Sequence, residues 1–279
     1  MQNKDIDAIT EDWVATPPAV YFKFKEAVED PDTSFKEFSE ILSADPGLLI
    51  RLLKIVNSPF YGLDAKVETV EHAMTIVGLN QLSDLVLTTT IMNEFSGVPG
   101  DLLNMNTFWE HSVAVGVSAQ ILAGYLGEKE LERFYIAGML HDIGTLVICK
   151  KAPEKMMRAV KLEKEGAGAM HETEREVMGF SHADVGSSLL RAWKLPQRLL
   201  DCVSFHHHPL DAKRNMKEAA IIYFADYLAD QIGSGDLGDV SPPKLDPAVL
   251  KSLELNETIL LSMREESQER FAEAIKLFS

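Results

Sequence analysis

The stretch GMLHDIGTL, residues 138–146, places a histidine and an aspartate side by side between two apolar runs. The longer segment around it, residues 130–150, has apolar residues at the three- and four-residue steps of a helix. Adjacent residues on a helix point about 100° apart, so His141 and Asp142 cannot both face the same core neighbour. An unpartnered polar group in an apolar setting costs on the order of 2 kcal/mol or more, so this pair needs polar partners from elsewhere in the fold.

Most of the chain has the same helical spacing of apolar residues. Thr33, Asp45 and Thr69 each precede such a segment and are residue types suited to cap a helix at its N-terminus. The β-branched run VLTTTI, residues 86–91, could form a strand, but apolar residues at helical spacing flank it and favour a helix. The sequence therefore predicts an all-α fold.

The best candidate for an internal boundary is SGVPGD, residues 96–101, where two glycines and a proline separate helical segments. We expect a helical N-terminal lobe, residues 1–100, packed on a helical bundle of residues 101–232. A loop rich in glycine, proline and aspartate begins at residue 233 and leads to a polar helix around residues 255–277. Residues 233–279 therefore form a separate C-terminal segment in this prediction.

The composition disfavours several classes of function. The net charge of −16 opposes binding to nucleic acids and to anionic membrane surfaces, because both carry negative charge. No apolar run reaches the roughly 18 residues of a membrane span, and the first residues lack the pattern of a secretory signal. Two cysteines are too few for a disulfide framework or a thiolate metal cage. We therefore expect a cytoplasmic protein that binds neither nucleic acids nor membranes.

Several of the eight histidines lie where a core residue is expected. His111, His141 and His182 each lie in an otherwise apolar helical segment, and residues 206–208, all histidine, end another. Asp226 interrupts the apolar run AIIYFADYLA. Each of these residues taken alone is more often solvated or hydrogen-bonded in a core. Together the five segments favour one shared metal site, because imidazole and carboxylate are ligands of zinc and first-row transition metals.

The order of these residues along the chain, His, then His-Asp, then Asp, resembles the HD superfamily of metal-dependent phosphohydrolases. The resemblance implies one set of ligands for a first metal and, from the HD-GYP branch, further histidines for a second. Carried onto this chain, the first set is His111, His141, Asp142 and Asp226, and the second-metal ligands are His182, His206 and His207.

Three longer stretches resemble the HDOD domain, an HD-related output domain of bacterial signalling proteins. They are ILSADPGLLIRLLKIVNSPFYG at residues 41–62, TVEHAMTIVGLNQLSDLVL at residues 69–87 and SHADVGSSLLRAWKLPQRLLDCVSFHHHP at residues 181–209. The resemblance covers roughly residues 18–232. It implies a bacterial signalling module. Because the sequence shows no receiver or sensor domain, we expect the input to come from other proteins in trans. Many HDOD domains have lost metal ligands that this chain retains.

The chain departs from the HD-GYP hydrolases at three positions. His208 stands where these enzymes have an acidic residue, no GYP loop follows it, and Thr145 replaces the lysine of their HDIGK motif. Thr107 replaces the glutamate of trinuclear relatives, so we expect at most two metal ions. Fe, Mn, Zn or Ni would suit an imidazole-rich site. Asp142 would bridge the ions and, if the site is catalytic, orient water.

Three functions remain open from the sequence. The first is a regulatory HDOD module that binds metal and acts through signalling proteins or a small phosphate-bearing ligand. The second is a metal-dependent phosphohydrolase acting on a nucleotide, a cyclic dinucleotide or another phosphoester. The third is a metal-free interaction domain. In all three, we expect His72 to be structural or exposed, His171 in the charged stretch HETERE to be solvated, and His208 to lie outside the site.

Overall fold

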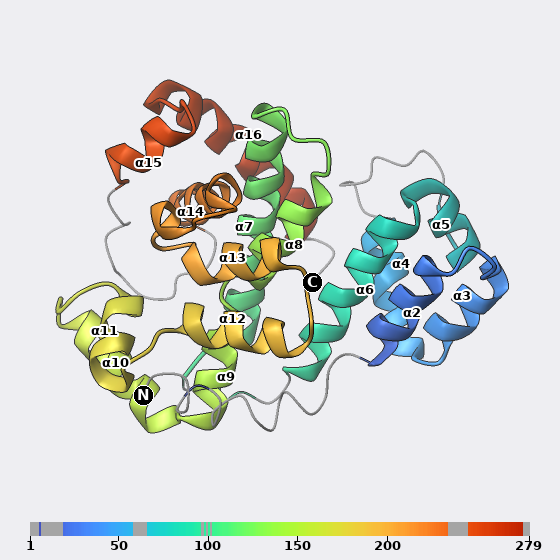
Figure 1. Ribbon diagram of the computed structural model, residues 1–279, viewed down its shortest axis with the longest axis horizontal. Coiled ribbons are helices and arrows are strands. Elements are labelled where there is room, and N and C mark those ends of the chain that lie inside the picture. The colour runs from blue at the N-terminus through green and yellow to red at the C-terminus, as the bar shows by residue number, and fades with distance from the viewer. Residues whose placement is uncertain are drawn as a thin grey trace. The chain divides into compact units, whose positions relative to one another are not determined.

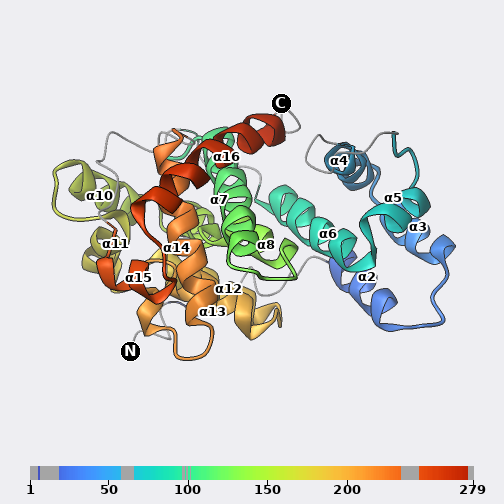
Figure 2. The same cartoon turned by 90° about the horizontal axis from the view of Figure 1, so that it is seen from above.

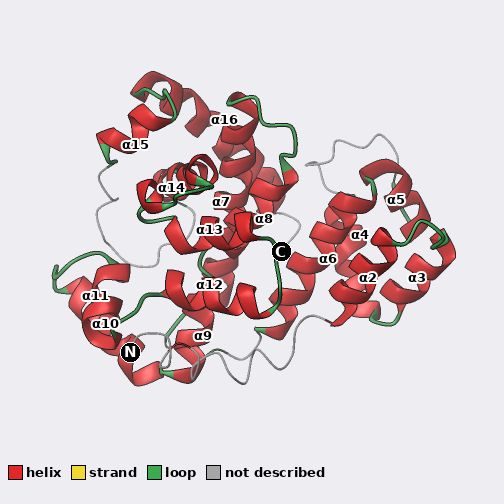
Figure 3. Cartoon of the chain, viewed as in Figure 1, coloured by secondary structure: helices red, strands yellow, loops and turns green. Residues whose placement is uncertain are grey.

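The computed structural model describes residue 6 and residues 19–57, 66–95, 98, 100, 102–233 and 245–275 (Figure 1). These residues form helices joined by turns and loops, and no strand occurs among them (Figure 3). The predicted all-α class is therefore confirmed. In this part of the chain, no helix is both long and apolar enough to span a lipid bilayer.

The chain divides into two compact units, and the smaller one contains residues 16–96 and 270–279. Its helices are α2 (Ala19–Glu29), α3 (Phe35–Ser43), α4 (Pro46–Val56), α5 (Val70–Val77) and α6 (Leu79–Glu94). α2 packs on α3 and α6, and both α4 and α5 contact the same two helices. The unit has its own apolar core, which includes the fully buried side chains of Phe24, Phe38, Leu48, Leu52 and Leu82.

The N-terminal caps of this unit match the sequence prediction at two positions and differ at one. The side chain of Asp45 accepts the backbone N–H of Leu48, and the Thr69 hydroxyl accepts that of His72, as expected for caps. The predicted cap at Thr33 is wrong, because Ser34 precedes α3. Its hydroxyl accepts the backbone N–H of Glu37 at 3.3 Å, and the Glu37 carboxylate accepts the backbone N–H of Ser34 at 2.7 Å. This reciprocal capping box satisfies two helix-end donors, which Thr33 cannot do from one position earlier.

The β-branched run at residues 86–91 is helical, as predicted, and lies within α6. The hydroxyls of Thr88, Thr89 and Thr90 donate to the backbone carbonyl four residues earlier, at 3.1, 2.6 and 2.6 Å. These bonds satisfy the buried hydroxyls within the helix, so the run is helical without leaving these groups unpaired. The predicted boundary at residues 96–101 lies largely outside the described residues.

The larger unit contains residues 1–15 and 97–269. Its helices are α7 (Met105–Tyr125), α8 (Glu132–Leu140), α9 (Ile143–Lys151), α10 (Pro153–Lys164), α11 (Met170–Met178), α12 (His182–Ala192), α13 (Gln197–Phe205), α14 (Met216–Gln231), α15 (Pro247–Ser252) and most of α16 (Glu257–Ile275), with a short 3₁₀ helix at Pro209–Asp211. α7 is the central helix, because every residue from 111 to 123 is buried. α8 and α14 pack against α7 and against each other (Figure 2).

The helix predicted over residues 130–150 is wrong as a continuous element, because α8 ends at Leu140 and α9 begins at Ile143. His141 and Asp142 form the turn between them, so the chain changes direction at this dipeptide. Because the turn breaks the 100° rotation of a continuous helix, both side chains can reach one cluster of partners. His141 Nε2 lies 3.4 Å from Asp142 Oδ2.

Glycines bring the helices that carry this turn into backbone contact with their neighbours. A Cβ atom at Gly138 in α8 would lie 2.6 Å from the backbone nitrogen of Gly116 in α7. A Cβ atom at Gly144 in α9 would lie 2.0 Å from the carbonyl oxygen of His182 in α12. No side chain fits at either contact, so the close packing of α8 on α7 and of α9 on α12 requires glycine.

Candidate metal centre

The seven side chains predicted to bind metal come from five separate parts of the larger unit and meet in one cluster. His111 lies on α7, and Asp226 lies on α14. His141 and Asp142 lie at the α8–α9 turn, His182 is the first residue of α12, and the pair at 206–207 follows the end of α13. All of these except Asp142, His207 and Asp226 are buried, and the Asp142 side chain is only 16% exposed.

One half of the cluster contains His111, His141 and Asp226. Asp226 Oδ1 lies 3.1 Å from His111 Nε2 and 3.7 Å from His141 Nε2. The donor atoms of all three residues lie within 4.8 Å of one another. One carboxylate therefore faces two imidazoles in a space that one cation could share.

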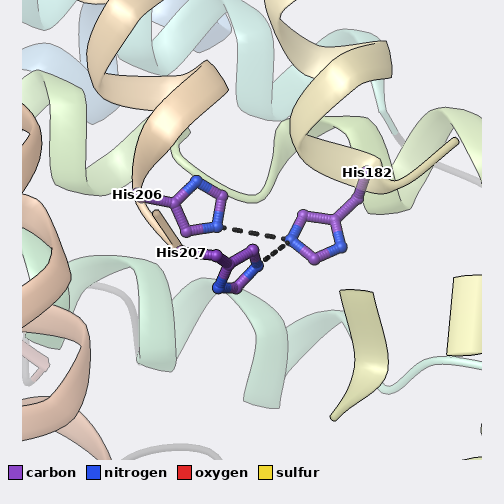
Figure 4. Close-up of side chains that lie close together, drawn as sticks. All are labelled: His182, His206 and His207. Carbon is purple, nitrogen blue, oxygen red and sulfur yellow. Dashed lines mark hydrogen bonds between the residues drawn. The ribbon is translucent and has the colours of Figure 1, made fainter. Parts of the chain in front are cut away.

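The other half contains His182, His206 and His207, whose rings face one another (Figure 4). His182 Nε2 lies 3.3 Å from His206 Nε2 and 2.8 Å from His207 Nε2. Three imidazole nitrogens thus point to one place. This arrangement is suited to bind a transition-metal ion, because imidazole nitrogens are ligands of such ions.

Asp142 lies between the two halves. Its Oδ1 is 3.2 Å from His182 Nε2 and 3.5 Å from His206 Nε2, and its Oδ2 is 3.4 Å from His141 Nε2. Each oxygen of this one carboxylate therefore faces histidines of a different half.

The outward-facing nitrogens of three histidines are held by acceptors. His141 Nδ1 donates to the carbonyl oxygen of Gly138 at 2.6 Å, and His206 Nδ1 donates to that of Val203 at 2.8 Å. His182 Nδ1 donates to Glu174 Oε2 at 2.7 Å. Because a carbonyl or a carboxylate oxygen only accepts, the proton lies on Nδ1 in each ring, and Nε2 faces the cluster. Hydrogen bonds of this kind orient histidine ligands in metal sites.

The donor atoms fit a divalent metal ion. His141 Nε2 and Asp142 Oδ1 are buried without a hydrogen-bond partner, which leaves two atoms that can ligate a metal unsatisfied at the middle of the cluster. With metal–nitrogen bonds of about 2.0–2.1 Å, neighbouring ligands of one ion lie roughly 3.0–3.4 Å apart. The observed separations of 2.8–3.7 Å bracket this range.

The carboxylates of the cluster hold protons on three of the histidines. Burial acts to lower the pKa of His111, but the hydrogen bond and charge of Asp226 outweigh it and raise this pKa to about 9. Burial is likewise outweighed at His141 by Asp142, and at His182 by Glu174 and Asp142, so both pKa values are raised. A metal ion must displace protons from these rings, so its binding would weaken as the pH falls.

The other two histidines behave in the opposite way. Burial, reinforced by the neighbouring imidazoles, lowers the pKa of His206 and of His207. Burial acts to raise the pKa of Asp142, but the charges of His141 and His182 hold it well below its ordinary value. The His206 and His207 rings are therefore neutral at pH 7, which is the form that binds metal.

Two residues of α11 that the sequence prediction left out belong to this region. Glu174 is fully buried beneath His182, and the ring of His171 stacks on that of His207, with centroids 4.0 Å apart and planes 16° apart. Burial, followed by the neighbouring imidazoles, lowers the pKa of His171 to about 3. The expectation that His171 is simply solvated is therefore wrong. The three-residue spacing of these two residues on one helix face was the only signal in the charged stretch HETERE.

The remaining predictions about histidines hold. His72 and His208 are both exposed, and the His208 ring meets the edge of His171 at 5.3 Å. Another acidic side chain, Asp230, lies one turn after Asp226 on α14, with Oδ1 4.0 Å from His111 Nδ1. Burial and the charge of Asp226 raise the pKa of Asp230 to about 6. It lies at the edge of the cluster rather than within it.

Comparisons with known proteins place the chain in a family. An uncharacterized protein of Treponema pallidum (strain Nichols) is 26% identical over 192 residues, which are 68% of this chain and 37% of that protein. The chain thus spans little more than a third of the length of this relative.

Two crystal structures have a similar fold over nearly their whole length. One is an HDOD domain protein of unknown function from Geobacter sulfurreducens, with 23% identity, a TM-score of 0.79 and coverage of 99% and 98% of the two chains. The other is a candidate phosphohydrolase from Shewanella amazonensis SB2B, with 23% identity, a TM-score of 0.74 and coverage of 97% and 96%. The family model of the HDOD domain matches residues 14–209, and the chain is therefore a member of the HDOD domain family.

Proposed function

We propose that this chain is a regulatory HDOD module of bacterial signal transduction that retains a dinuclear metal centre. His111, His141 and Asp226 would hold one ion, and His182, His206 and His207 would hold the other. The observation that carries the proposal is the position of Asp142, whose two oxygens face histidines of the two halves, with Oδ1 buried and lacking a hydrogen-bond partner. A carboxylate in this place is suited to bridge two cations.

The donor set indicates the class of metal. Five imidazoles and two carboxylates favour Fe, Mn, Zn or Ni over Ca or Mg, which prefer oxygen ligands. When bound, such ions supply Lewis acidity and positive charge for an anionic ligand. The protein residues orient the imidazoles from outside and keep Asp142 ionised through its histidine neighbours.

A regulatory role is favoured over hydrolysis by the charges around the centre. Within the described ranges, the groups that dominate the pKa values of the seven candidate ligands are histidines and carboxylates, with no lysine or arginine among them. Thr145, at the position of the hydrolases' lysine, is short and uncharged. Position 145 thus lacks the cation that would help to orient a phosphate, and orientation contributes several kcal/mol to catalysis. The module would act through signalling proteins that bind it in trans.

A metal-dependent phosphohydrolase is the second candidate. The structural similarity to a candidate phosphohydrolase and the bridging position of Asp142 support it. In this role Asp142 would orient a water molecule between the two halves, and metal ions held by the seven residues would supply positive charge for a phosphate. We expect weak or absent turnover of cyclic dinucleotides and any residual activity to be directed at simpler phosphoesters.

The metal content of the protein tests the first proposal. Protein purified without added metal is analysed by elemental mass spectrometry, next to Asp142→Asn and the control Asp211→Asn, which changes an exposed carboxylate of the same unit. We expect up to two transition-metal ions per chain in the wild type and in the control, and fewer in Asp142→Asn. An Asp142→Asn variant with the stoichiometry of the wild type would contradict the bridging role.

A panel of phosphoesters and cyclic dinucleotides separates the two functions. Each substrate is incubated with the Mn²⁺- or Fe²⁺-loaded protein, and turnover is compared between the wild type and Asp142→Asn. Robust cyclic-dinucleotide hydrolysis that Asp142→Asn abolishes would show that the regulatory proposal is wrong and the hydrolase proposal right.

A further inference from the structure

We propose that α11 positions the His182–His206–His207 half of the metal centre, and that Glu174 and His171 on this helix are its positioning residues. The proposal rests on the proposed function, because it assumes that these histidines bind a metal ion. The two α11 residues are three positions apart and share one helix face. One of them contacts His182, and the other contacts His207.

Glu174 holds both the backbone and the ring of His182. A single carboxylate oxygen, Oε2, accepts the backbone N–H of His182 at 2.8 Å and its Nδ1–H at 2.7 Å. His182 is the first residue of α12, so the carboxylate also faces the positive end of that helix. These bonds fix where α12 begins and direct Nε2 of His182 toward the other histidines.

The partner of His182 differs in charge from the partners of the other oriented rings. His141 and His206 donate to neutral backbone carbonyls, whereas His182 donates to a carboxylate. A carboxylate in this position increases the basicity of the imidazole and hence its strength as a ligand. Glu174 is fully buried with Oε1 lacking a hydrogen-bond partner, which is costly and which an apolar side chain of similar size would avoid. Packing alone therefore does not account for this glutamate.

His171 restrains the second ligand of the same half. Its ring lies nearly parallel to that of His207 at a centroid distance of 4.0 Å, which limits rotation of the His207 ring. His207 Nε2 in turn lies 2.8 Å from His182 Nε2. Restraint of both rings from α11 keeps these two nitrogens aimed at one point, and α11 would thereby set the metal affinity of this half.

Zn²⁺ binding to the full chain tests this inference. Metal-free protein is titrated with Zn²⁺ against a chelating indicator to obtain the dissociation constants of the two halves. The variants His111→Ala and His207→Ala assign each constant to its half. We expect Glu174→Ala to weaken the His182–His206–His207 half about 10–100-fold and to leave the other constant unchanged. Glu174→Gln should have a smaller effect, because its amide oxygen still accepts the Nδ1 proton but lacks the charge.

His171 provides an independent pair of variants. His171→Ala removes the stack and should weaken the same half, whereas His171→Phe restores a flat ring and should return the affinity to that of the wild type. The matched control is Glu176→Gln, which removes one exposed charge from the same helix and should change neither constant. Circular dichroism of each metal-free variant verifies folding. If Glu174→Ala does not fold, the Zn²⁺ affinities of Glu174→Gln, His171→Ala and His171→Phe test whether α11 positions this half.

The outcomes separate this inference from the proposed function. Failure of the wild type to bind Zn²⁺ would overturn both. Two Zn²⁺ equilibria in the wild type that stay unchanged in folded Glu174 and His171 variants would overturn the role of α11 alone. Equal weakening of both halves would also overturn it, because a general loss of structure would then explain the effect.

Discussion

Replacing Gly144 by alanine tests how the α9–α12 contact supports the candidate centre. The added Cβ would lie 2.0 Å from the carbonyl oxygen of His182 and 2.6 Å from the backbone nitrogen of Gly186, whereas Cβ atoms do not approach other atoms within 3.0 Å. Both atoms belong to the backbone, so α9 and α12 must separate by roughly 1 Å. Overpacking of this kind costs about 1–3 kcal/mol.

The separation would act on the site as well as on stability. Asp142 lies two residues before Gly144, and its Oδ1 is 3.2 Å from Nε2 of His182 on α12. A shift of roughly 1 Å between α9 and α12 would change the distance between Asp142 Oδ1 and His182 Nε2. The affinity for metal should therefore fall together with the stability. Thermal unfolding of the metal-free protein, followed by circular dichroism, should show a loss of about 2–4 °C for each kcal/mol.

The matched control is Gly124→Ala on α7. A Cβ at Gly124 meets only the Leu131 side chain, at 3.5 Å and 3.9 Å, so it fits without strain. This exchange should leave the melting temperature unchanged or raise it, because alanine is the better helix former. If Gly144→Ala melted at or above the wild-type temperature, the argument from the α9–α12 contact would be refuted.

Three further perturbations are expected to have measurable effects. The pKa of His111 is raised in the fold to about 9 from 6.5, so its stabilising effect is complete below pH 6.5 and is lost as the pH rises to about 9. Urea unfolding of the metal-free protein should show this loss, on the order of 3 kcal/mol, and His111→Gln should reduce the slope between these pH values. Ser34→Ala should cost about 1 kcal/mol by loss of the capping box, while Thr33→Ala should cost far less; equal losses would contradict the assignment of the cap. Chelation should lower the melting temperature of protein that retains its metal, because the ions bind the folded state, and an unchanged temperature after verified removal would favour a metal-free domain.

The helical class was predictable because apolar residues recur at helical spacing through most of the chain. The clustering of the candidate ligands was also predictable, since polar groups such as His111 and Asp226 in apolar segments require partners. The turn at His141 and Asp142 was not, because the apolar spacing continues across it without a glycine or proline at the dipeptide itself. Beyond the turn, Gly144 of α9 meets the backbone of α12, a tertiary contact that local spacing does not specify.

The residues around the ligands were harder to predict than the ligands themselves. Glu174 stands in a stretch of charged residues, and only its three-residue spacing from His171 distinguishes it from the exposed Glu176 two positions later. Its burial depends on how α11 packs against α10 and α12, which local spacing does not specify. The cap at Ser34 was missed for a local reason, because the reciprocal bond to Glu37 decides between two neighbouring hydroxyl residues.

The acceptors behind the histidine rings differ in how easily mutation can remove them. Gly138 and Val203 hold His141 and His206 through carbonyl oxygens, which every amino acid possesses, so no substitution at those positions deletes the acceptor. His182 depends on a side chain, and one substitution at Glu174 deletes its acceptor. Substitutions at the acceptor positions thus leave the acceptors of His141 and His206 in place. The acceptor of His182 is lost by one substitution. A single change at position 174 would therefore weaken metal binding by the His182–His206–His207 half while every histidine remains in the sequence.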